Sequence, residues 1–416
     1  KPDIKNTECP YDPGCYFIIN GNEKIVLSVE RIQENKVLIF PKKDTTSPTG
    51  YSYRAQINSK PLDRNDIIQL TSLIIKKDKS LFLLVSQFHE IPVFVMMRAL
   101  GIERDDDIIK MIVLDDNDFE MKNILRNSLL NLLMDPTKPE SDTNPFIRTQ
   151  KQALEFLQNN IRYVFRYFTE SDEELKKKQM EMHIMKILTK DFLPHQGHNL
   201  YNKAIFLGHI IHRLFRVYLG RDIPDDRDSY LNKRIDLPGT LIGQLFHHFY
   251  RKMLTDIGNF FQKKNNDDEN PTNVISQIKP TTIEQGIKSA LTTGVWGPNK
   301  AKKGIAQALQ RESYMQTISY FRRIITPSPD SSTSKLTSIR HIQNTQPFFI
   351  CAVETPEGNK IGLLKTLSNS ANVSMNMENQ RPIIENICSS FIDKLEEVPI
   401  EDILVFTKVF INGTWE

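Results

Sequence analysis

Residues 16–29 read Tyr-Phe-Ile-Ile-Asn-Gly-Asn-Glu-Lys-Ile-Val-Leu-Ser-Val and carry the clearest local folding signal of the chain. Two apolar runs flank Asn20-Gly21, and a two-residue hairpin turn of type I′ requires positive φ at both of its central residues. Asparagine and glycine tolerate that conformation better than other residues do. The stretch therefore predicts two antiparallel strands joined by a tight turn.

Further elements are indicated on the carboxyl side of this hairpin. Leu38–Phe40 and Tyr51–Ile57 have the residue types of strands. Pro92–Leu100 starts at a proline and stops before Gly101, which predicts a short helix. The last third returns to strand-like runs at Phe348–Val353 and Leu404–Ile411.

The middle of the chain has a helical pattern. Asn202–Leu219 is apolar around most of its circumference, which predicts a helix buried on most sides. Leu241 and Leu245 continue the helical spacing after Pro238. A helical middle flanked by strands, in 416 residues, predicts an α+β multidomain protein of mixed helices and antiparallel sheets.

Composition limits the classes of function. Apolar residues make up 39% of the chain, which excludes disorder throughout. The 54 basic and 51 acidic side chains leave a net charge of +3, so binding of nucleic acid would need a local basic surface. The sequence predicts no transmembrane helix and no membrane partner. It starts at Lys1 without a methionine and stops shortly after a second Asn-Gly turn at Asn412, before a return strand can form, so we expect a fragment of a longer polypeptide.

Two acidic clusters are candidates for binding Mg²⁺, because paired carboxylates serve that purpose in phosphoryl transfer. They are Asp105–Asp107 and Asp115–Asp118. The first lies where a helix could begin, and capping of its amino terminus explains it more simply. No nucleotide-binding loop or nucleophile motif is present. On its own residues the chain predicts no catalytic residue and no metal ligand.

Residues 300–340 are rich in basic side chains, and only Glu312 and Asp330 oppose them. Clustered positive charge of this kind suits contact with phosphates. A solvated basic face explains the pattern equally well, so both interpretations stay open. The basic residues are Lys300, Lys302, Lys303, Arg311, Arg322, Arg323, Lys335 and Arg340.

The stretch Arg340–Gly358 reads Arg-His-Ile-Gln-Asn-Thr-Gln-Pro-Phe-Phe-Ile-Cys-Ala-Val-Glu-Thr-Pro-Glu-Gly. It resembles the signature of the second-largest subunits of multisubunit DNA-directed RNA polymerases, equivalent to the bacterial beta subunit. The form Thr-Gly-Val-Trp-Gly at Thr293–Gly297 resembles most the RNA polymerase II branch, cellular or from a large DNA virus. Other blocks match in the family's order, and these are Glu8–Ile25, Arg98–Ile102, Phe192–His195, Asp226–Asp228, Lys233–Arg234 and Phe410–Trp415.

The resemblance implies the protrusion, lobe and fork architecture of that family. Residues 1–31 would be the first part of the protrusion, and residues 32–235 the lobe. Residues 236–296 would be the second part of the protrusion. Residues 297–373 would form the fork, and residues 374–416 the start of an external domain.

The resemblance also implies site residues. Gln307, Arg311 and Arg323 would face the RNA–DNA hybrid, and Arg340 would lie near the incoming nucleotide. Arginine suits this work because its guanidinium group binds phosphates bidentately and keeps its charge. The loop from Thr326 to Lys335 resembles the fork loop near the point of strand separation. Glu354, Glu357 and Gly358 belong to the signature, and we expect the two glutamates to fix loops or form ion pairs.

This sequence departs from the family's pattern around the signature. Gln343 and Gln346 stand where the family has histidines, Phe348 where it has a glycine, and Ala352 where it has a proline.

The implied function is that of one wall of the DNA cleft in DNA-dependent RNA polymerase, a nucleotidyltransferase that acts in transcription. Mg²⁺ would be bound mainly by another subunit, and the partners would be the largest subunit, other polymerase subunits, the DNA template and the RNA–DNA hybrid. The location would be the nucleus for a cellular protein, or the viral factory or virion for a viral one. The alternatives are a protein-interaction scaffold and a metal-dependent phosphotransferase.

Overall fold

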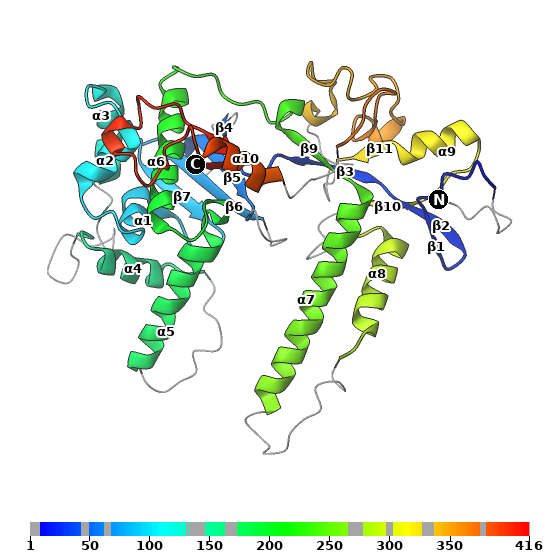
Figure 1. Ribbon diagram of the computed structural model, residues 1–416, viewed down its shortest axis with the longest axis horizontal. Helices are drawn as coiled ribbons and strands as arrows, with labels where there is room; N and C mark the ends of the chain where they lie inside the picture. Colours follow the sequence, from blue (N-terminus) through cyan, green and yellow to red (C-terminus); the bar gives the residue numbers. More distant parts are fainter. Residues whose placement is uncertain are drawn as a thin grey trace. The chain divides into compact units, whose positions relative to one another are not determined.

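The computed structural model describes residues 9–42, 50–61, 68–129, 132, 146–162, 173–264, 278–296, 303–326, 337–374 and 380–415, without the side chains of residues 173–176 and 262–264. The chain divides into two compact units, and each is made of segments distant in sequence (Figure 1). One unit joins Lys1–Ile32 to Asp228–Met375, and we call it the split-strand unit. The other joins Gln33–Arg227 to Asn376–Glu416, and we call it the sheet–helix unit.

The sheet–helix unit contains a five-stranded antiparallel sheet with the order β4-β5-β6-β7-β8. Alternate residues of β7 are buried, as expected when one face of a strand covers a core. Both strands predicted from residues 38–57 are present. The strand bounds are β4 (Leu38–Pro41), β5 (Tyr51–Ser59), β6 (Gln69–Lys76), β7 (Leu81–Val85) and β8 (Ile91–Pro92).

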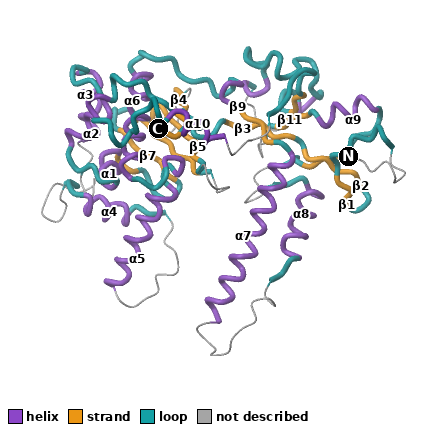
Figure 2. The backbone as a smooth tube through the Cα atoms, in the orientation of Figure 1, coloured by secondary structure: helices purple, strands orange, loops and turns teal. Residues whose placement is uncertain are grey.

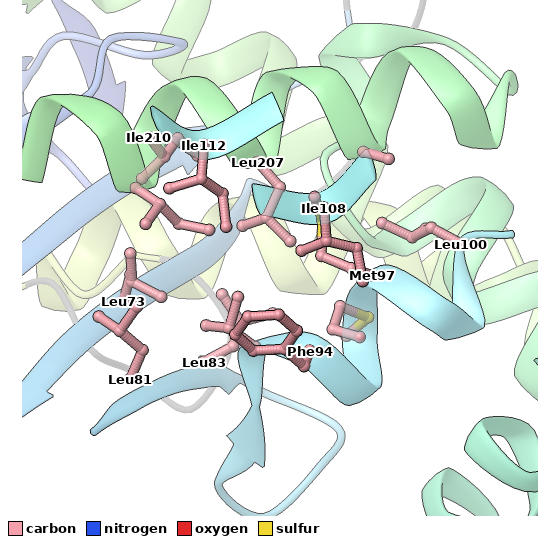
Figure 3. Packing of buried hydrophobic residues seen from close by; sticks show 14 of the residues in the cluster. Leu73, Leu81, Leu83, Phe94, Met97, Leu100, Ile108, Ile112, Leu207 and Ile210 are labelled. Atoms are coloured by element: carbon pink, nitrogen blue, oxygen red, sulfur yellow. The ribbon is translucent and has the colours of Figure 1, made fainter. Parts of the chain in front are cut away.

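Helices of the same unit pack on this sheet. Leu73 and Leu83 of the sheet meet Phe94, Ile112 and Leu207 of three helices in one apolar core (Figure 3). The helix predicted from Pro92 and the buried helix predicted at residues 202–219 are both confirmed. The bounds are α1 (Val93–Ala99), α2 (Asp105–Val113), α3 (Phe119–Leu129), α4 (Gln150–Asn159), α5 (Glu173–Lys186), α6 (Leu200–Tyr218) and α10 (Arg381–Cys388), with a π-helical turn at Ile187–Asp191 and 3₁₀ turns at Pro194–Gln196 and Ile400–Asp402.

The second Asn-Gly turn does have a return strand, so the expectation that the chain stops too early for one was wrong. β13 (Phe410–Ile411) pairs with β14 (Thr414–Trp415) through two residues on each side. The strand expected from Leu404 is shorter than predicted, because only its last two residues are extended. Trp415 is 7% exposed and belongs to the core of this unit.

In the split-strand unit, the described residues form two small sheets, β1-β2-β10 and β12-β11-β3-β9. The hairpin predicted at Asn20-Gly21 is confirmed, with Ile19 paired to Asn22 and φ of 51° and 77° at the two turn residues. All sheet pairs are antiparallel except β11 with β3, so the α+β class with mainly antiparallel sheets is confirmed in the described chain. The strand bounds are β1 (Phe17–Ile19), β2 (Asn22–Val26), β3 (Ser28–Ile32), β9 (Lys233–Asp236), β10 (Ala306–Ala308), β11 (Arg323–Ile325) and β12 (Leu364–Thr366).

In the described residues of the split-strand unit, three α-helices accompany the sheets, and 3₁₀ turns lie at Tyr230–Asn232, Ser338–Arg340 and Gly358–Lys360. α7 (Pro238–Lys264) and α8 (Thr281–Thr293) lie side by side (Figure 2), and α9 (Tyr314–Phe321) precedes β11. Trp296 donates from its indole nitrogen to the carbonyl oxygen of Leu241 at 3.1 Å, which ties the end of α8 to α7.

The strand predicted at residues 348–353 is not formed. A turn occupies residues 347–349, and only Ile350 makes an isolated bridge, to Leu367. Among the described residues, no helix is both long and apolar enough to cross a bilayer.

Candidate nucleic-acid interface

Three side chains near the end of α9 form one cluster, and two of them were predicted as site residues. The Tyr320 hydroxyl donates to Gln307 Oε1 at 3.0 Å, and the guanidinium group of Arg323 lies 4.2 Å from the centre of the Tyr320 ring. Gln307 also donates to the carbonyl oxygen of Gly304 at 2.9 Å. Tyr320 is 5% exposed and so has few alternative positions. We call these three residues the tyrosine cluster. In it, Tyr320 fixes the side chain of Gln307 by a hydrogen bond and supports the guanidinium group of Arg323 with its ring.

Arg323 differs from the other predicted arginines in its electrostatics. It is half-buried at the start of β11, and among the described residues its side chain interacts with the Tyr320 ring alone. A guanidinium group stacked on a ring keeps its hydrogen-bond donors available at the edge. Arg323 is therefore equipped to receive an anion from outside the chain.

Arg311 is held by carboxylates of the first hairpin region. Its Nε and Nη2 atoms donate to Glu23 at 2.8 and 3.0 Å, and Asp12 lies 3.8 Å away. The ring of Tyr16 lies 4.9 Å from the guanidinium carbon. The hydrogen bond from Arg311 holds the pKa of Glu23 below its usual range. A phosphate would have to compete with this pair for Arg311.

Arg340 holds the loop that follows the signature. Its Nη1 donates to the carbonyl oxygens of Asn359 and Ile361 at 2.8 and 3.0 Å. Gly362 lies against the same backbone, with φ of +70°, and a Cβ there would come within 2.3 Å of the Arg340 carbonyl oxygen. Arg340 and the signature loop therefore form a tightly fitted unit.

The signature residues Glu354, Glu357 and Gly358 lie at different points of one exposed loop. Glu354 is exposed and accepts a hydrogen bond from the hydroxyl of Ser319, which ties the loop to α9. Glu357 and Gly358 are exposed, and Gly358 has φ of +77° at the start of its 3₁₀ turn. Thr355 accepts from the backbone nitrogen of Gly362 at 2.9 Å. The loop is thus closed by backbone and hydroxyl contacts.

A buried ionic cluster beneath these loops was missed from the sequence. Glu30 is 4% exposed, and its carboxylate lies 3.0 Å from Lys233 Nζ and 2.9 Å from Lys365 Nζ. Tyr230 donates its hydroxyl to the same carboxylate at 2.6 Å. Burial would raise the pKa of Glu30, but Lys365 and Lys233 outweigh burial and hold it below its usual value. The three partners lie some 200 residues or more from Glu30 in the sequence, so no local pattern could have indicated them.

In its described part, the structure does not bring the predicted residues of the fork loop together with the tyrosine cluster. Thr326 follows β11, and its backbone nitrogen donates to the carbonyl oxygen of Leu363 at 3.0 Å. Lys335 and the rest of the predicted fork loop at 327–336 lie outside the described residues, as do Lys300 and Lys302.

The acidic clusters have structural explanations. Asp105–Asp107 form the first turn of α2, as predicted, and Asp118 pairs with Arg221. In the described part of the chain, no three His, Cys, Asp or Glu side chains are grouped so that they could hold a metal ion.

The geometry and the motifs point to one class of protein. Two family models match the chain: RNA polymerase Rpb2, domain 2, over residues 34–236, and RNA polymerase Rpb2, domain 3, over residues 307–373. The chain belongs to this family, the second-largest subunits of multisubunit DNA-directed RNA polymerases, so the predicted resemblance is confirmed.

Individual relatives are consistent with that assignment. DNA-directed RNA polymerase subunit 2 of Acanthamoeba polyphaga mimivirus is 39% identical over 100% of this chain and 35% of its own length. The RNA polymerase II subunit RPB2 of Encephalitozoon cuniculi is 32% identical over 98% of the chain and 34% of its own length. RNA polymerase II subunit 2 of Arabidopsis thaliana is 33% identical over 98% of the chain and 33% of its own length. The chain spans about a third of the length of the curated relatives it matches.

Proposed function

We propose that this chain forms one wall of the DNA cleft of a DNA-dependent RNA polymerase and positions the RNA–DNA hybrid and the downstream DNA during transcription. Membership of the family supports this interpretation over a scaffold or a phosphotransferase. The single structural observation that carries the proposal is Arg323, whose guanidinium group is supported by Tyr320 and has no carboxylate partner within the described residues.

The chemistry of Arg323 fits contact with a nucleic-acid backbone. A phosphate contact carries no sequence information, which suits an enzyme that must advance along any template. Gln307 can add an amide to the same surface, because Tyr320 fixes both side chains. Arg311 contributes when a phosphate displaces Glu23. Arg340 positions the signature loop near the incoming nucleotide, and the loop from Thr326 to Lys335 lies near the point of strand separation.

The wider assignment follows from the same proposal. Residues 1–31 and 236–296 form the protrusion, residues 32–235 the lobe, residues 297–373 the fork, and residues 374–416 begin an external domain. The partners are the largest subunit, other polymerase subunits, the DNA template and the hybrid. Mg²⁺ acts in the assembled enzyme and is bound mainly by another subunit. The enzyme works in the nucleus if the source is cellular, or in a viral factory or virion if it is a large DNA virus.

The test is the salt dependence of nucleic-acid binding by the assembled polymerase. Each lost phosphate contact lowers the slope of log K against log salt by about 1. We expect Arg323→Ala to weaken binding about 5–10-fold and to reduce this slope by about 1. Arg221→Ala is the control, because it removes an arginine whose guanidinium group is already held by Asp118 and Glu120. An unchanged slope for Arg323→Ala would remove the main support for the proposal.

A further inference from the structure

Phe348 has a backbone conformation that its side chain disfavours. Its φ is +71°, and it is the one aromatic residue with positive φ in the described part of the chain. Asn20 and Asn412 also have positive φ, but each belongs to an Asn-Gly hairpin turn, where asparagine is tolerated. The polar side chain of asparagine can form a local hydrogen bond in the left-handed region, whereas the side chain of phenylalanine cannot. The left-handed conformation of Phe348 is therefore strained.

Burial does not compensate this strain. Leu193 is also left-handed, with φ of +42°, but it is 0% exposed and its side chain packs in the apolar core. Phe348 is 84% exposed. An exposed phenylalanine ring gains little from the hydrophobic effect, and so the strained position and the exposed ring both act against stability.

The surrounding backbone enforces the conformation. The backbone nitrogens of Phe349 and Ile350 both donate to the carbonyl oxygen of Gln346 at 3.0 Å. The hydroxyl of Ser368 donates to the carbonyl oxygen of Phe348. The backbone nitrogen of Ser368 donates to the carbonyl oxygen of Phe349 at 3.0 Å. The turn therefore presents the Phe348 ring on a rigid base, and backbone strain of this kind gathers at functional sites.

The same turn lies next to a positive charge. Arg322 donates from Nη2 to the carbonyl oxygen of Ser368, the residue that also binds the Phe348 carbonyl. Arg322 precedes Arg323 of the tyrosine cluster, so two guanidinium groups start from adjacent positions. Aromatic faces next to cationic side chains are the combination that single strands of nucleic acid recognise, because bases stack on rings and phosphates meet charges.

We propose that Phe348 is a stacking platform for an unpaired nucleobase of the DNA or RNA strand in the cleft. This inference rests on the proposed function and adds a specific contact to it. Stacking on a phenyl ring accepts every base, since every base has a π face, and therefore suits a strand of any sequence.

The test sets nucleic-acid affinity against the stability of the turn in the assembled polymerase. Phe348→Gly removes the ring and relieves the strain of the positive φ, because glycine adopts that angle freely. Phe348→Trp keeps an aromatic ring on which a base can stack. We expect Phe348→Gly to weaken binding of an RNA–DNA scaffold with an unpaired template base about tenfold, or about 1.4 kcal/mol. Hydrogen-exchange protection of residues 341–353 should stay the same or rise. Phe348→Trp should bind within about twofold of the unaltered enzyme.

A photochemical arm identifies the strand. We place 5-iodouracil either in the template DNA or in the RNA and expect one of the two to cross-link to the peptide that contains Phe348. The strand that cross-links is the one that supplies the stacked base. Phe391→Gly is the matched control, because Phe391 is 86% exposed and belongs to the other unit. It should leave both affinity and cross-link unchanged.

Each result decides the question. Unchanged affinity in Phe348→Gly would overturn the inference while leaving the proposed function intact. Loss of subunit assembly with normal affinity in the assembled fraction would also overturn it, since the ring would then pack against protein. If the unaltered polymerase fails to bind the scaffold, the proposed function and the inference fall together.

Discussion

Lys203 is a fully buried cation in the sheet–helix unit, and within the described residues its hydrogen bonds go to backbone carbonyl oxygens. Its Nζ donates to Leu188, Thr189 and Phe192 at 2.9, 2.8 and 2.6 Å. Burial lowers the pKa of Lys203 to about 8, so the ammonium group is partly destabilised even as it caps the π-helical turn.

Replacing Lys203 should destabilise the unit. Lys203→Met leaves three carbonyl oxygens without this donor, and we expect the free energy of unfolding to fall by about 1–3 kcal/mol. Lys190→Met is the control, because Lys190 lies in the same π-helical turn but is exposed. Urea denaturation measures both variants, and equal midpoints would mean that the three hydrogen bonds contribute nothing net.

Glu30 and Glu23 allow a comparison between a buried and an exposed ion pair in the split-strand unit. Glu30→Gln leaves the half-buried Lys233 and the buried Lys365 without their carboxylate, which should cost about 3–5 kcal/mol. Glu23→Gln breaks the exposed pair with Arg311 and should cost less than about 1 kcal/mol. Thermal and urea unfolding would show the difference; similar losses would mean that burial does not set the strength of these pairs.

At the scale of elements, a comparison of the two Asn-Gly hairpins distinguishes the free-energy cost of backbone strain in a turn from the cost of a steric clash with a neighbouring segment. Gly413 has φ of +88°, and a Cβ there would lie 2.2 Å from the carbonyl oxygen of Asn35. Gly21 has φ of +77° and no atom within 4 Å of the same position. We expect Gly21→Ala to cost about 1 kcal/mol from strain alone, and Gly413→Ala to cost at least twice as much.

Limited proteolysis at residues 404–415 checks this expectation alongside the unfolding midpoint. Faster cleavage is expected in Gly413→Ala and not in Gly21→Ala. If both variants resisted cleavage equally, the close approach to Asn35 would not be what holds the second hairpin.

The same elements show what a sequence can and cannot predict. The hairpin at Asn20-Gly21 was predictable because its signal lies within the turn itself. The run Phe348–Val353 looked like a strand by residue type, but hydrogen bonds to Gln346 and Ser368 bend it into a turn. Arg323 was proposed through the resemblance, and its contact with the Tyr320 ring was not foreseen. The Glu30 cluster depends on contacts between distant segments that local patterns do not encode.

At the scale of the whole molecule, the two units should differ in their sensitivity to acid. In the sheet–helix unit, the pKa values of His195 and His209 are lowered to about 3, mainly by burial, and the positive charge of Lys408 contributes to the shift of His209. Below pH 6.5 the unfolded chain takes up protons that these folded histidines refuse, so stability falls as the pH drops from about 6.5 towards 3. In the split-strand unit, Glu30 keeps its charge until the pH falls below its usual value of 4.5.

We therefore expect the sheet–helix unit to open first on acidification. Each histidine should cost about 2 kcal/mol by pH 5, since one pKa unit corresponds to 1.36 kcal/mol. Hydrogen exchange, corrected for the intrinsic rate at each pH, reports α6 and β3 separately and should show loss of protection in α6 between pH 6.5 and 5, with β3 still protected. The double variant His195→Gln, His209→Gln should weaken this pH dependence, because neither side chain can then bind the extra proton in the unfolded state. His212, whose pKa is also lowered by burial, retains part of it. Simultaneous loss of protection in α6 and β3 would mean that other groups control the acid response.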